Sequence, residues 1–384
     1  MSLEQKVFFE LVKAGLFPVH GEGGMVSGSF PKEVDWNVVY RLAEEQSVVG
    51  LVAAGIDAVL GSGLKVKGPP LVPQAVALQF IGQTLQIEQH NKAMNDFVAR
   101  LIEKLRANDI YTLLVKGQGI SQCYEKPLWR ACGDVDLLLS DSDYKKAKKV
   151  LLPLASSVEQ EFVFLKHLGM TIDGWEVELH GSQRPRLTNL IDKVVDEVQD
   201  DVFHGGKVRL WMNDGTQVFM PAPDEDMIFV FTHILHHYYQ EGIGLRQICD
   251  WCRLLWTYKD SLDRGLLESR LRKMGLMSEW RAFAAFTVDY LGMPVDAMPL
   301  YSSEKKWLKK AKRINDFVLE VGNFGRNRSS LSSDVRSRSF ITRKAASLWR
   351  RTTDSFRHFV TFPKNSMKIW LYMVKTGVMV VRGE

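Results

Sequence analysis

"RACGDVDLLLSD", residues 130–141, carries two aspartates two positions apart within an apolar run. Val135 and the leucines that follow have the composition of a buried strand. Successive side chains of a strand alternate between its faces, so Asp134 and Asp136 share one face, roughly 7 Å apart along the chain. Two ionised carboxylates placed in this way repel each other unless a proton or a cation lies between them. A hard divalent cation such as Mg²⁺ would resolve the repulsion, because it binds oxygen ligands.

A magnesium site needs further oxygen ligands, and a later stretch offers one. In "GWEVELHG", residues 174–181, Glu176, Glu178 and His180 alternate along a second short strand and so share a face. This strand is therefore the expected source of a third carboxylate.

A site for phosphate is predicted just before the aspartate strand. "LLVKGQGIS", residues 113–121, ends a strand at Lys116 and Gly117 and then opens a helix. Gly117 would let a phosphate approach the backbone, the start of the helix offers free N–H donors, and Lys116 supplies positive charge. Arg130 adds a fork of donors that suits phosphate oxygens.

The pattern of predicted helices and strands divides the chain into three parts. Residues 1–108 are predicted to be a helical region, with helices near 3–17 and 74–108 and a helix capped by Ser29 that has Pro31 in its first turn. Residues 109–221 alternate short strands and helices, which predicts an α+β core with a mixed β-sheet. Residues 222–384 are predicted to be helical and to end in a basic tail.

The strands expected in the core are 111–116, 134–139, 161–167, 175–180, 207–212 and 216–220. A short helix is expected over 117–126, between the first two strands. A second helix, capped by Asp141 or Ser142, is expected after the strand 134–139.

The ordered set of motifs resembles the nucleotidyltransferase superfamily that includes DNA polymerase β. It is most similar to the bacterial uncharacterised nucleotidyltransferase family, in which K-G, R, D-x-D, an acid-Leu-His strand and a helical "LR-x-x-x-D" segment follow one another. This chain has Lys116-Gly117, Arg130, "GDVDLLL", "VELH" and "GLRQICDWCRLL" in that order, over roughly residues 75–260. The resemblance implies a nucleotidyltransferase-type mixed sheet flanked by helical regions.

The resemblance also implies a site and a reaction. Asp134, Asp136 and Glu178 would be catalytic carboxylates and metal ligands, and Lys116, Gly117 and Arg130 would bind the nucleotide. Two Mg²⁺ ions, or Mn²⁺ in their place, would support transfer of a nucleoside monophosphate from an NTP to a hydroxyl, with release of pyrophosphate. Glu178 would be the candidate base.

Two departures from the family pattern are visible. Gln118 follows Gly117 where the superfamily has Gly-Ser or Gly-Gly, so a hydroxyl contact to phosphate is missing. Glu178 stands where many relatives have Asp. The sequence leaves open which NTP is used, and also whether the acceptor is a small molecule, a sugar, a protein or RNA.

Other motifs have simpler interpretations. His233 and His237 are four residues apart on a helix, but the glutamate of H-E-x-x-H is missing, so packing or polar helix roles are expected, with a place for His233 in the site as the alternative. Arg246 and Asp250 have the spacing of a surface ion pair, with support of the nucleotide as the alternative. The four cysteines are expected to be buried free thiols, as in a reducing cytoplasm.

The net charge of +5 is unevenly distributed. Residues 336–384 contain eleven Lys or Arg against two acidic residues, a local excess of +9, so the rest of the chain carries about −4. The N-terminus lacks the pattern of a signal peptide, and no charge-free stretch predicts a transmembrane segment. The sequence does not define the oligomeric state.

Two rival functions remain at this stage. One is a catalytically silent module that keeps the fold and binds a nucleotide or a partner. The other is nucleic-acid or membrane-surface binding through the basic tail, whose cations are mixed with Trp349, Phe356 and Trp370. Packing of the tail aromatics onto the body of the protein is the simpler expectation for the tail.

Overall fold

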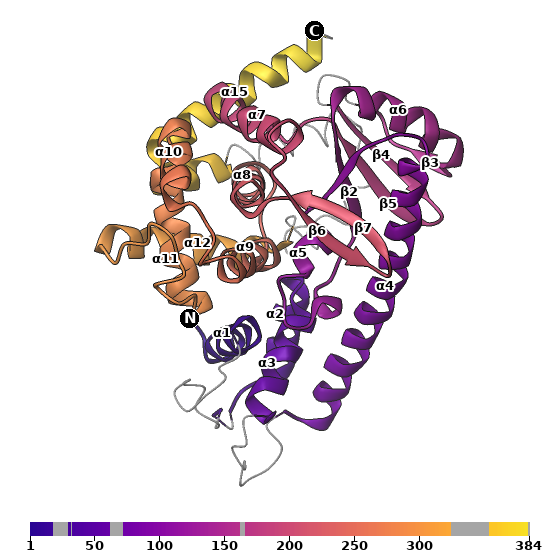
Figure 1. Cartoon of the computed structure of the whole chain (residues 1–384). Coiled ribbons are helices and arrows are strands. Elements are labelled where there is room, and N and C mark those ends of the chain that lie inside the picture. The colour runs from indigo at the N-terminus through magenta and orange to yellow at the C-terminus, as the bar shows by residue number, and fades with distance from the viewer. Residues whose placement is uncertain (18–29, 32, 62–71, 162–165, 324–352, 383–384) are drawn as a thin grey trace.

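The sheet and the helices that surround it are seen in a computed structural model of the chain (Figure 1). The structure describes residues 1–17, 30, 31, 33–61, 72–161, 166–323 and 353–382. A mixed five-stranded sheet lies beside helices that come from both ends of the chain. The predicted α+β class, with a mixed sheet and helical flanks, is therefore confirmed.

The N-terminal part is helical, as predicted. Its helices are α1 (Leu3–Leu16), α2 (Trp36–Glu45), α3 (Val49–Gly61) and α4 (Gln74–Arg106). Ser2 and Gln5 form a capping box at the start of α1. The side chain of Asp35 caps α2, which begins at Trp36. The prediction of a helix with Pro31 in its first turn is therefore wrong. Ser29 lies outside the described residues.

Glycines allow α1 and α3 to approach closely. A Cβ atom on Gly55 would overlap the carbonyl oxygen of Leu11, and one on Gly15 would overlap that of Leu51. Gly82 on α4 differs, because nothing lies within 4 Å of the place its Cβ would take. Gly15 and Gly55 are therefore required by packing, whereas Gly82 only weakens its helix.

The two kinds of glycine make a matched test of this packing. Gly55→Ala should lower the free energy of unfolding by about 1–3 kcal/mol, because the added methyl group overpacks the helix contact. Gly82→Ala should raise it by about 0.5–1 kcal/mol, because alanine favours an exposed helix. Guanidinium denaturation followed by circular dichroism measures both, and a fully stable Gly55→Ala protein would refute the close contact.

The main sheet has the strand order β1-β2-β5-β4-β3. Its strands are β1 (Thr112–Val115), β2 (Asp134–Leu139), β3 (Ser157–Val158), β4 (His167–Ile172) and β5 (Trp175–His180). The β2–β5 pair is parallel and the other pairs are antiparallel. The parallel register puts Asp136 beside Glu178 and Asp134 beside Glu176. Acidic side chains of two strands thus share one face of the sheet.

The opposite face of these strands is apolar and packs on α4, which runs along the sheet (Figure 1). Val135 and Leu137 of β2 are fully buried there, together with Phe97 and Leu101 of α4. The two faces of β2 therefore differ as its sequence alternates. Val135 and Leu137 pack in the core, and Asp134 and Asp136 lie on the opposite face.

Helices next to the sheet differ from the predicted ones at their ends. Helix α5 (Gly117–Ser121) is shorter than the predicted helix over 117–126, and a 3-10 turn over Pro127–Trp129 follows it. Helix α6 (Asp141–Leu151) is capped by the Ser140 side chain, not by Asp141 or Ser142. Ser140 directly follows β2 and still has extended backbone, as an N-cap requires.

The strand predicted over 161–167 overlaps β4 only at His167, and residues 162–165 lie outside the described part of the chain. The observed strand continues through "LGMTI" instead. The other predicted strands are present. β6 (Val208–Asn213) and β7 (Thr216–Pro221) form a hairpin whose turn residues, Asp214 and Gly215, have φ of 46° and 86°.

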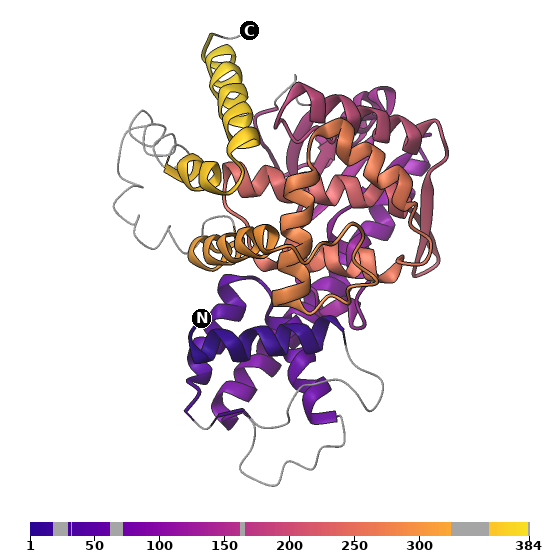
Figure 2. The ribbon, with the colours of Figure 1, turned by 90° about the vertical axis from the view of Figure 1, so that its left-hand side faces the viewer.

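Helices after the sheet form the second layer of the molecule (Figure 2). They are α7 (Asn189–Phe203), α8 (Pro223–Gln240), α9 (Leu245–Thr257), α10 (Arg264–Met274), α11 (Met277–Leu291), α12 (Lys305–Val321) and α15 (Pro363–Arg382). Helices α8 and α9 are mostly buried, and Phe231 of α8 stacks on Trp251 of α9 with ring centroids 5.2 Å apart. This aromatic core fixes both helices opposite the acidic face of the sheet.

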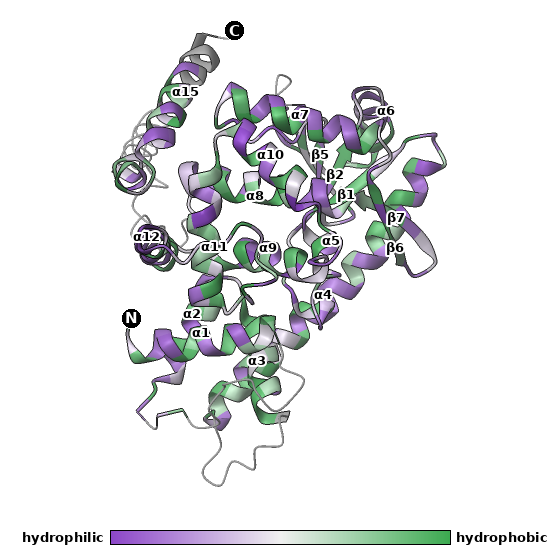
Figure 3. Ribbon diagram, turned by 60° about the vertical axis from the view of Figure 1, so that its left-hand side comes forward, coloured by the Kyte–Doolittle hydropathy of each residue, from purple (hydrophilic) through white to green (hydrophobic). Residues whose placement is uncertain are grey.

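The described part of the basic tail packs on the body at a few positions only, so the expected packing of its aromatic residues is correct for Phe362 but wrong for Phe356 and Trp370. Phe362 and Ile369 are buried, and the Tyr372 hydroxyl donates to Asp192 at 3.0 Å. Phe356 and Trp370 stay exposed, and polar and apolar positions alternate along α15 (Figure 3). None of the described helices is long and apolar enough to cross a membrane.

Candidate active site

Three carboxylates meet on one face of the sheet. One oxygen each of Asp134, Asp136 and Glu178 lies within 4.8 Å of the other two. The parallel pairing of β2 and β5 produces this cluster, because it sets Asp136 and Glu178 side by side. Glu176, which shares their face, is exposed and lies outside the cluster. The structure thus brings together the three acidic residues that the sequence singled out.

Lys116 neutralises part of this charge. Its Nζ lies 2.7 Å from Oδ1 of Asp136, a carboxylate that is only 2% exposed. Lys116 occupies the turn between β1 and α5 with φ 57° and ψ −143°, a conformation that is costly for any residue with a side chain. The strained turn directs the lysine to the carboxylates, and Gly117 follows it with φ 25°.

Imidazoles also contact the cluster. Nε2 of His180 lies 2.7 Å from Oδ1 of Asp136 and 3.2 Å from Oε2 of Glu178. Nε2 of His167, on β4, lies 3.1 Å from the same Glu178 oxygen. Sequence reasoning placed His180 on the acidic face without a role and missed His167, because the pairing of β4 with β5 has no signal in the local pattern.

The carboxylates differ in their pKa values. The charge of Asp136, followed by burial, raises the pKa of Asp134 to about 6. Burial would also raise the pKa of Asp136, but Lys116 and His180 outweigh it and hold that pKa below its usual value. Burial is likewise outweighed at Glu178, where hydrogen bonds from the two imidazoles lower the pKa. Asp134 is therefore the carboxylate that protonates first as the pH falls.

Substitutions of its neighbours should move the pKa of Asp134 in opposite directions. Asp136→Asn should lower it from about 6 towards the ordinary value of about 3.9, because the repelling charge is removed. Lys116→Met should raise it, because an attracting charge is lost. Carboxyl ¹³C NMR titration measures both shifts. An Asp134 midpoint near 4 in the parent protein would show that the two aspartates do not repel each other.

A cavity of about 270 Å³ opens beside the carboxylates. The carboxylates and Lys116 form one wall, and α8 and α9 form the opposite wall with His233, His237 and Arg246. Gly117 and Arg130 also line it, so the predicted nucleotide-binding residues meet at one cavity. The cavity therefore combines a cluster of negative charge with cations in its lining.

Most of the chain, including the whole of this site, matches one protein family. The sequence matches the family described as uncharacterised nucleotidyltransferase over residues 32–292. The chain belongs to this nucleotidyltransferase family. The match covers the sheet, the carboxylates, the cavity and both helices of its far wall. Nucleotidyl transfer is thus the general chemistry supported for it, with a nucleotide as substrate and divalent metal as the usual requirement of such enzymes.

A solved structure of an antigenic nucleotidyltransferase-like protein from Paracoccidioides brasiliensis is also similar to this chain. It is 15% identical, the alignment covers 48% of this chain and 90% of that one, and the TM-score is 0.30. A likeness at that score adds no argument about fold or function. No curated protein matches the sequence.

Arg130 is held by a buried ion pair. Its Nε and Nη2 donate to the two oxygens of Asp250, at 3.1 and 2.5 Å, and the Tyr124 hydroxyl donates to the same carboxylate. The expected surface pair between Arg246 and Asp250 is therefore wrong, because α9 buries Asp250 against the loop that carries Arg130. Arg246 instead faces the cavity and donates to the carbonyl of Ala131.

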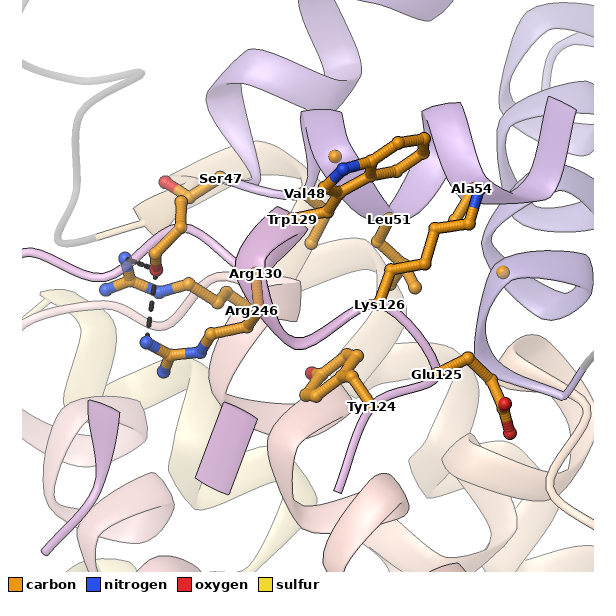
Figure 4. A pocket seen from close by; sticks show the side chains of 13 residues that line it. Ser47, Val48, Leu51, Ala54, Tyr124, Glu125, Lys126, Trp129, Arg130 and Arg246 are labelled. Atoms are coloured by element: carbon orange, nitrogen blue, oxygen red, sulfur yellow. Dashed lines mark hydrogen bonds between the residues drawn. The ribbon is translucent and has the colours of Figure 1, made fainter. Parts of the chain in front are cut away.

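A second, smaller cavity adjoins this ion pair (Figure 4). It lies between the N-terminal helices and the core, where Lys126 stands 3.8 Å from the centre of the Trp129 ring. Arg130 and Arg246 both donate to the Ala131 carbonyl at its edge (Figure 4). Its volume of about 30 Å³ holds little more than a water molecule, so it is no nucleotide site.

The burial of Arg130 and Asp250 has a consequence for stability. Arg130→Met should cost roughly 3–5 kcal/mol of unfolding free energy, because the Asp250 carboxylate is left buried without its cation. The double variant with Asp250→Leu should recover most of that loss. Arg184→Met, which breaks an exposed pair with Asp196, should cost at most about 1 kcal/mol. Denaturant unfolding compares them, and equal losses for the two arginine variants would contradict the assignment.

His233 and His237 were expected to pack or to decorate the helix surface. Both histidines line the cavity beside the carboxylates, on its far wall. Their Nε2 atoms lie 3.0 Å apart, and Nδ1 of His237 is 3.0 Å from Oε2 of Glu241. Burial, followed by the charge of Lys116, lowers the pKa of His233 well below its usual value, so His233 is neutral at pH 7.

Gln118 does not take the place of the missing hydroxyl contact. Its side chain is 1% exposed, and its amide nitrogen contacts the sulfur of Met94 and approaches the backbone oxygen of Asp134. Gln118 therefore packs between α5, β2 and α4 and does not face the cavity as a phosphate ligand would. All four cysteines are free and buried, as predicted.

Proposed function

We propose that this chain transfers a nucleoside monophosphate from an NTP to a hydroxyl of an acceptor and releases pyrophosphate, with Mg²⁺ or Mn²⁺ as cofactor. The observation that carries the proposal is the meeting of Asp134, Asp136 and Glu178 beside Lys116 at the edge of a cavity. Membership of the nucleotidyltransferase family supports the same chemistry in general terms.

The residues fit a divalent metal. Three carboxylates within 4.8 Å supply the oxygen ligands that Mg²⁺ prefers, and their mutual repulsion favours a cation among them. Among the described residues, the Asp134 carboxylate has no hydrogen-bond or ion-pair partner. Two bound ions would stabilise the attacking and leaving oxygens of the transfer. Glu178 suits a ligand better than a base, because its pKa is held low.

Lys116, Gly117 and Arg130 are the proposed binding residues for the triphosphate, and Arg246 joins them. Lys116 and Arg246 face the cavity, whereas the charge of Arg130 is already balanced by Asp250. Arg130 therefore contributes mainly by fixing the loop before β2. Gly117 has no Cβ, so a phosphate could approach its backbone closely, and glycine tolerates the positive φ at this position.

The three-part division of the chain is part of the proposal. The boundary near residue 108 follows the end of α4, and the boundary near 221 coincides with the end of β7. The core at 109–221 would carry the carboxylates, and the C-terminal region at 222–384 would supply the far wall of the cavity through α8 and α9. Acceptor contacts would come from the two helical regions.

Carboxylate variants test the function. Asp134→Asn and Glu178→Gln should each abolish Mg²⁺ binding by calorimetry and reduce pyrophosphate release by more than the roughly 10–100-fold loss of an outer-shell change, because each removes a metal ligand. Glu176→Gln is the matched control on the same strand and face, and it should leave both unchanged. Release is measured with each NTP against sugars, hydroxyl metabolites, peptides and RNA.

Three results would contradict the catalytic proposal. Tight NTP binding without pyrophosphate release from any acceptor would favour the catalytically silent module. Intact Mg²⁺ binding by Asp134→Asn would remove the basis of the site. Binding to RNA or anionic vesicles that falls steeply with salt, and that is lost on deletion of 336–384, would favour the role of the basic tail.

A further inference from the structure

The functional face of the sheet carries nitrogen ligands as well as oxygen ligands. In the pairing of β4 with β5, His167 stands directly opposite His180, and Gly169 stands opposite Glu178. Opposite residues of an antiparallel pair share a face, so both imidazoles lie on the face that carries the carboxylates. The absence of a side chain at Gly169 leaves space beside Glu178, and the carboxylate of Glu159 lies over that space.

Two imidazole nitrogens and one carboxylate oxygen converge there. Oε2 of Glu178 is 3.1 Å from Nε2 of His167 and 3.2 Å from Nε2 of His180. One ligand atom from each of the three residues lies within 4.8 Å of those of the other two. The imidazole centres are 4.9 Å apart, with the rings tilted by 36°. Ligand atoms about 2.0–2.1 Å from a tetrahedral ion lie roughly 3.3 Å from one another, so each imidazole nitrogen is already spaced from the Glu178 oxygen as a neighbouring ligand would be.

We propose that His167, His180 and Glu178 form a site for a transition-metal ion of the Zn²⁺ class. Two imidazoles with one carboxylate are the donors of open zinc sites, whereas Mg²⁺ prefers oxygen alone. Three protein ligands leave a coordination position free. Glu178 belongs to this set and to the carboxylate set, so it would lie between a hard-ion site on the β2 side and a transition-metal site on the β4 side.

Access and burial suit such a site. His180 is buried, and its Nε2 lies 2.7 Å from Oδ1 of Asp136, so a metal–nitrogen bond would replace this contact when an ion binds. The side chains of His167 and Glu178 are 28% and 31% exposed, so an ion can reach them from solvent. The inference goes beyond the proposed transfer reaction, because it concerns the residues of β4 and β5 and assigns them a second kind of metal.

Binding of Zn²⁺ and Co²⁺ to the purified full chain without an affinity tag tests the site. Zn²⁺ is titrated by calorimetry after removal of metal with a chelator, and Co²⁺ by its visible absorption, which reports nitrogen ligands. One ion per chain is expected for the parent protein. His167→Gln should weaken binding at least about tenfold, because one of three ligands is lost.

Controls separate this site from its surroundings. His204→Gln changes an exposed histidine that contacts Asp200 on α7, and it should leave Zn²⁺ binding unchanged. Asp134→Asn should lose Mg²⁺ binding and keep Zn²⁺ binding, because Asp134 belongs only to the carboxylate set. Circular dichroism confirms that each variant is folded, and the partly exposed His167 is chosen over the buried His180 for that reason.

Several results would overturn the inference. The first is the absence of Zn²⁺ binding by the parent protein, and the second is unchanged Zn²⁺ binding by His167→Gln. The third is loss of Zn²⁺ binding in Asp134→Asn, because that loss would place the ion among the carboxylates alone. A hydrogen-bonded cluster of two histidines and a glutamate would then account for the geometry. None of these readouts depends on pyrophosphate release, so a failure of the proposed function would leave this test intact.

Discussion

Repulsion among carboxylates is the constraint around which the molecule is arranged. The backbone pairing of β2 and β5 places Asp134, Asp136 and Glu178 on one face, where one oxygen of each lies within 4.8 Å of the others. The protein balances the charge with Lys116 on one side and with two imidazoles on the other. The raised pKa of Asp134 is the part of the repulsion that these contacts leave uncompensated.

The remainder of the fold holds this face in place and closes a cavity over it. Helix α4 packs on the apolar side of the sheet, and the aromatic core around Trp251 fixes α8 and α9 across from the acidic side. The buried pair of Arg130 and Asp250 ties the loop before β2 to α9. A strained backbone at Lys116 directs its cation to the carboxylates. Together these contacts make the charged face rigid.

Sequence patterns anticipated a substantial part of this site. The alternation in "DVDLLL" and "VELH" correctly placed the acidic residues on strand faces, and Lys116 and Gly117 were found at a strand-to-helix turn. The partners were harder to predict. Arg246 and Asp250 have the spacing of a helix pair, yet Asp250 binds Arg130, 120 positions earlier, because burial of α9 brings that arginine closer. The i, i+4 spacing of His233 and His237 on α8 left a place in the site only as an alternative, and the tertiary structure was needed to show that both line the cavity.

The sequence by itself determined which residues alternate, where glycine and proline interrupt an element, and to which family the order of motifs belongs. These properties depend on neighbours within a few positions, where backbone geometry fixes the direction of a side chain. Only the tertiary structure decided that β2 lies parallel to β5, that His167 faces His180, and that α8 and α9 close the cavity. Such contacts join distant segments, and their register is set by packing of the whole core.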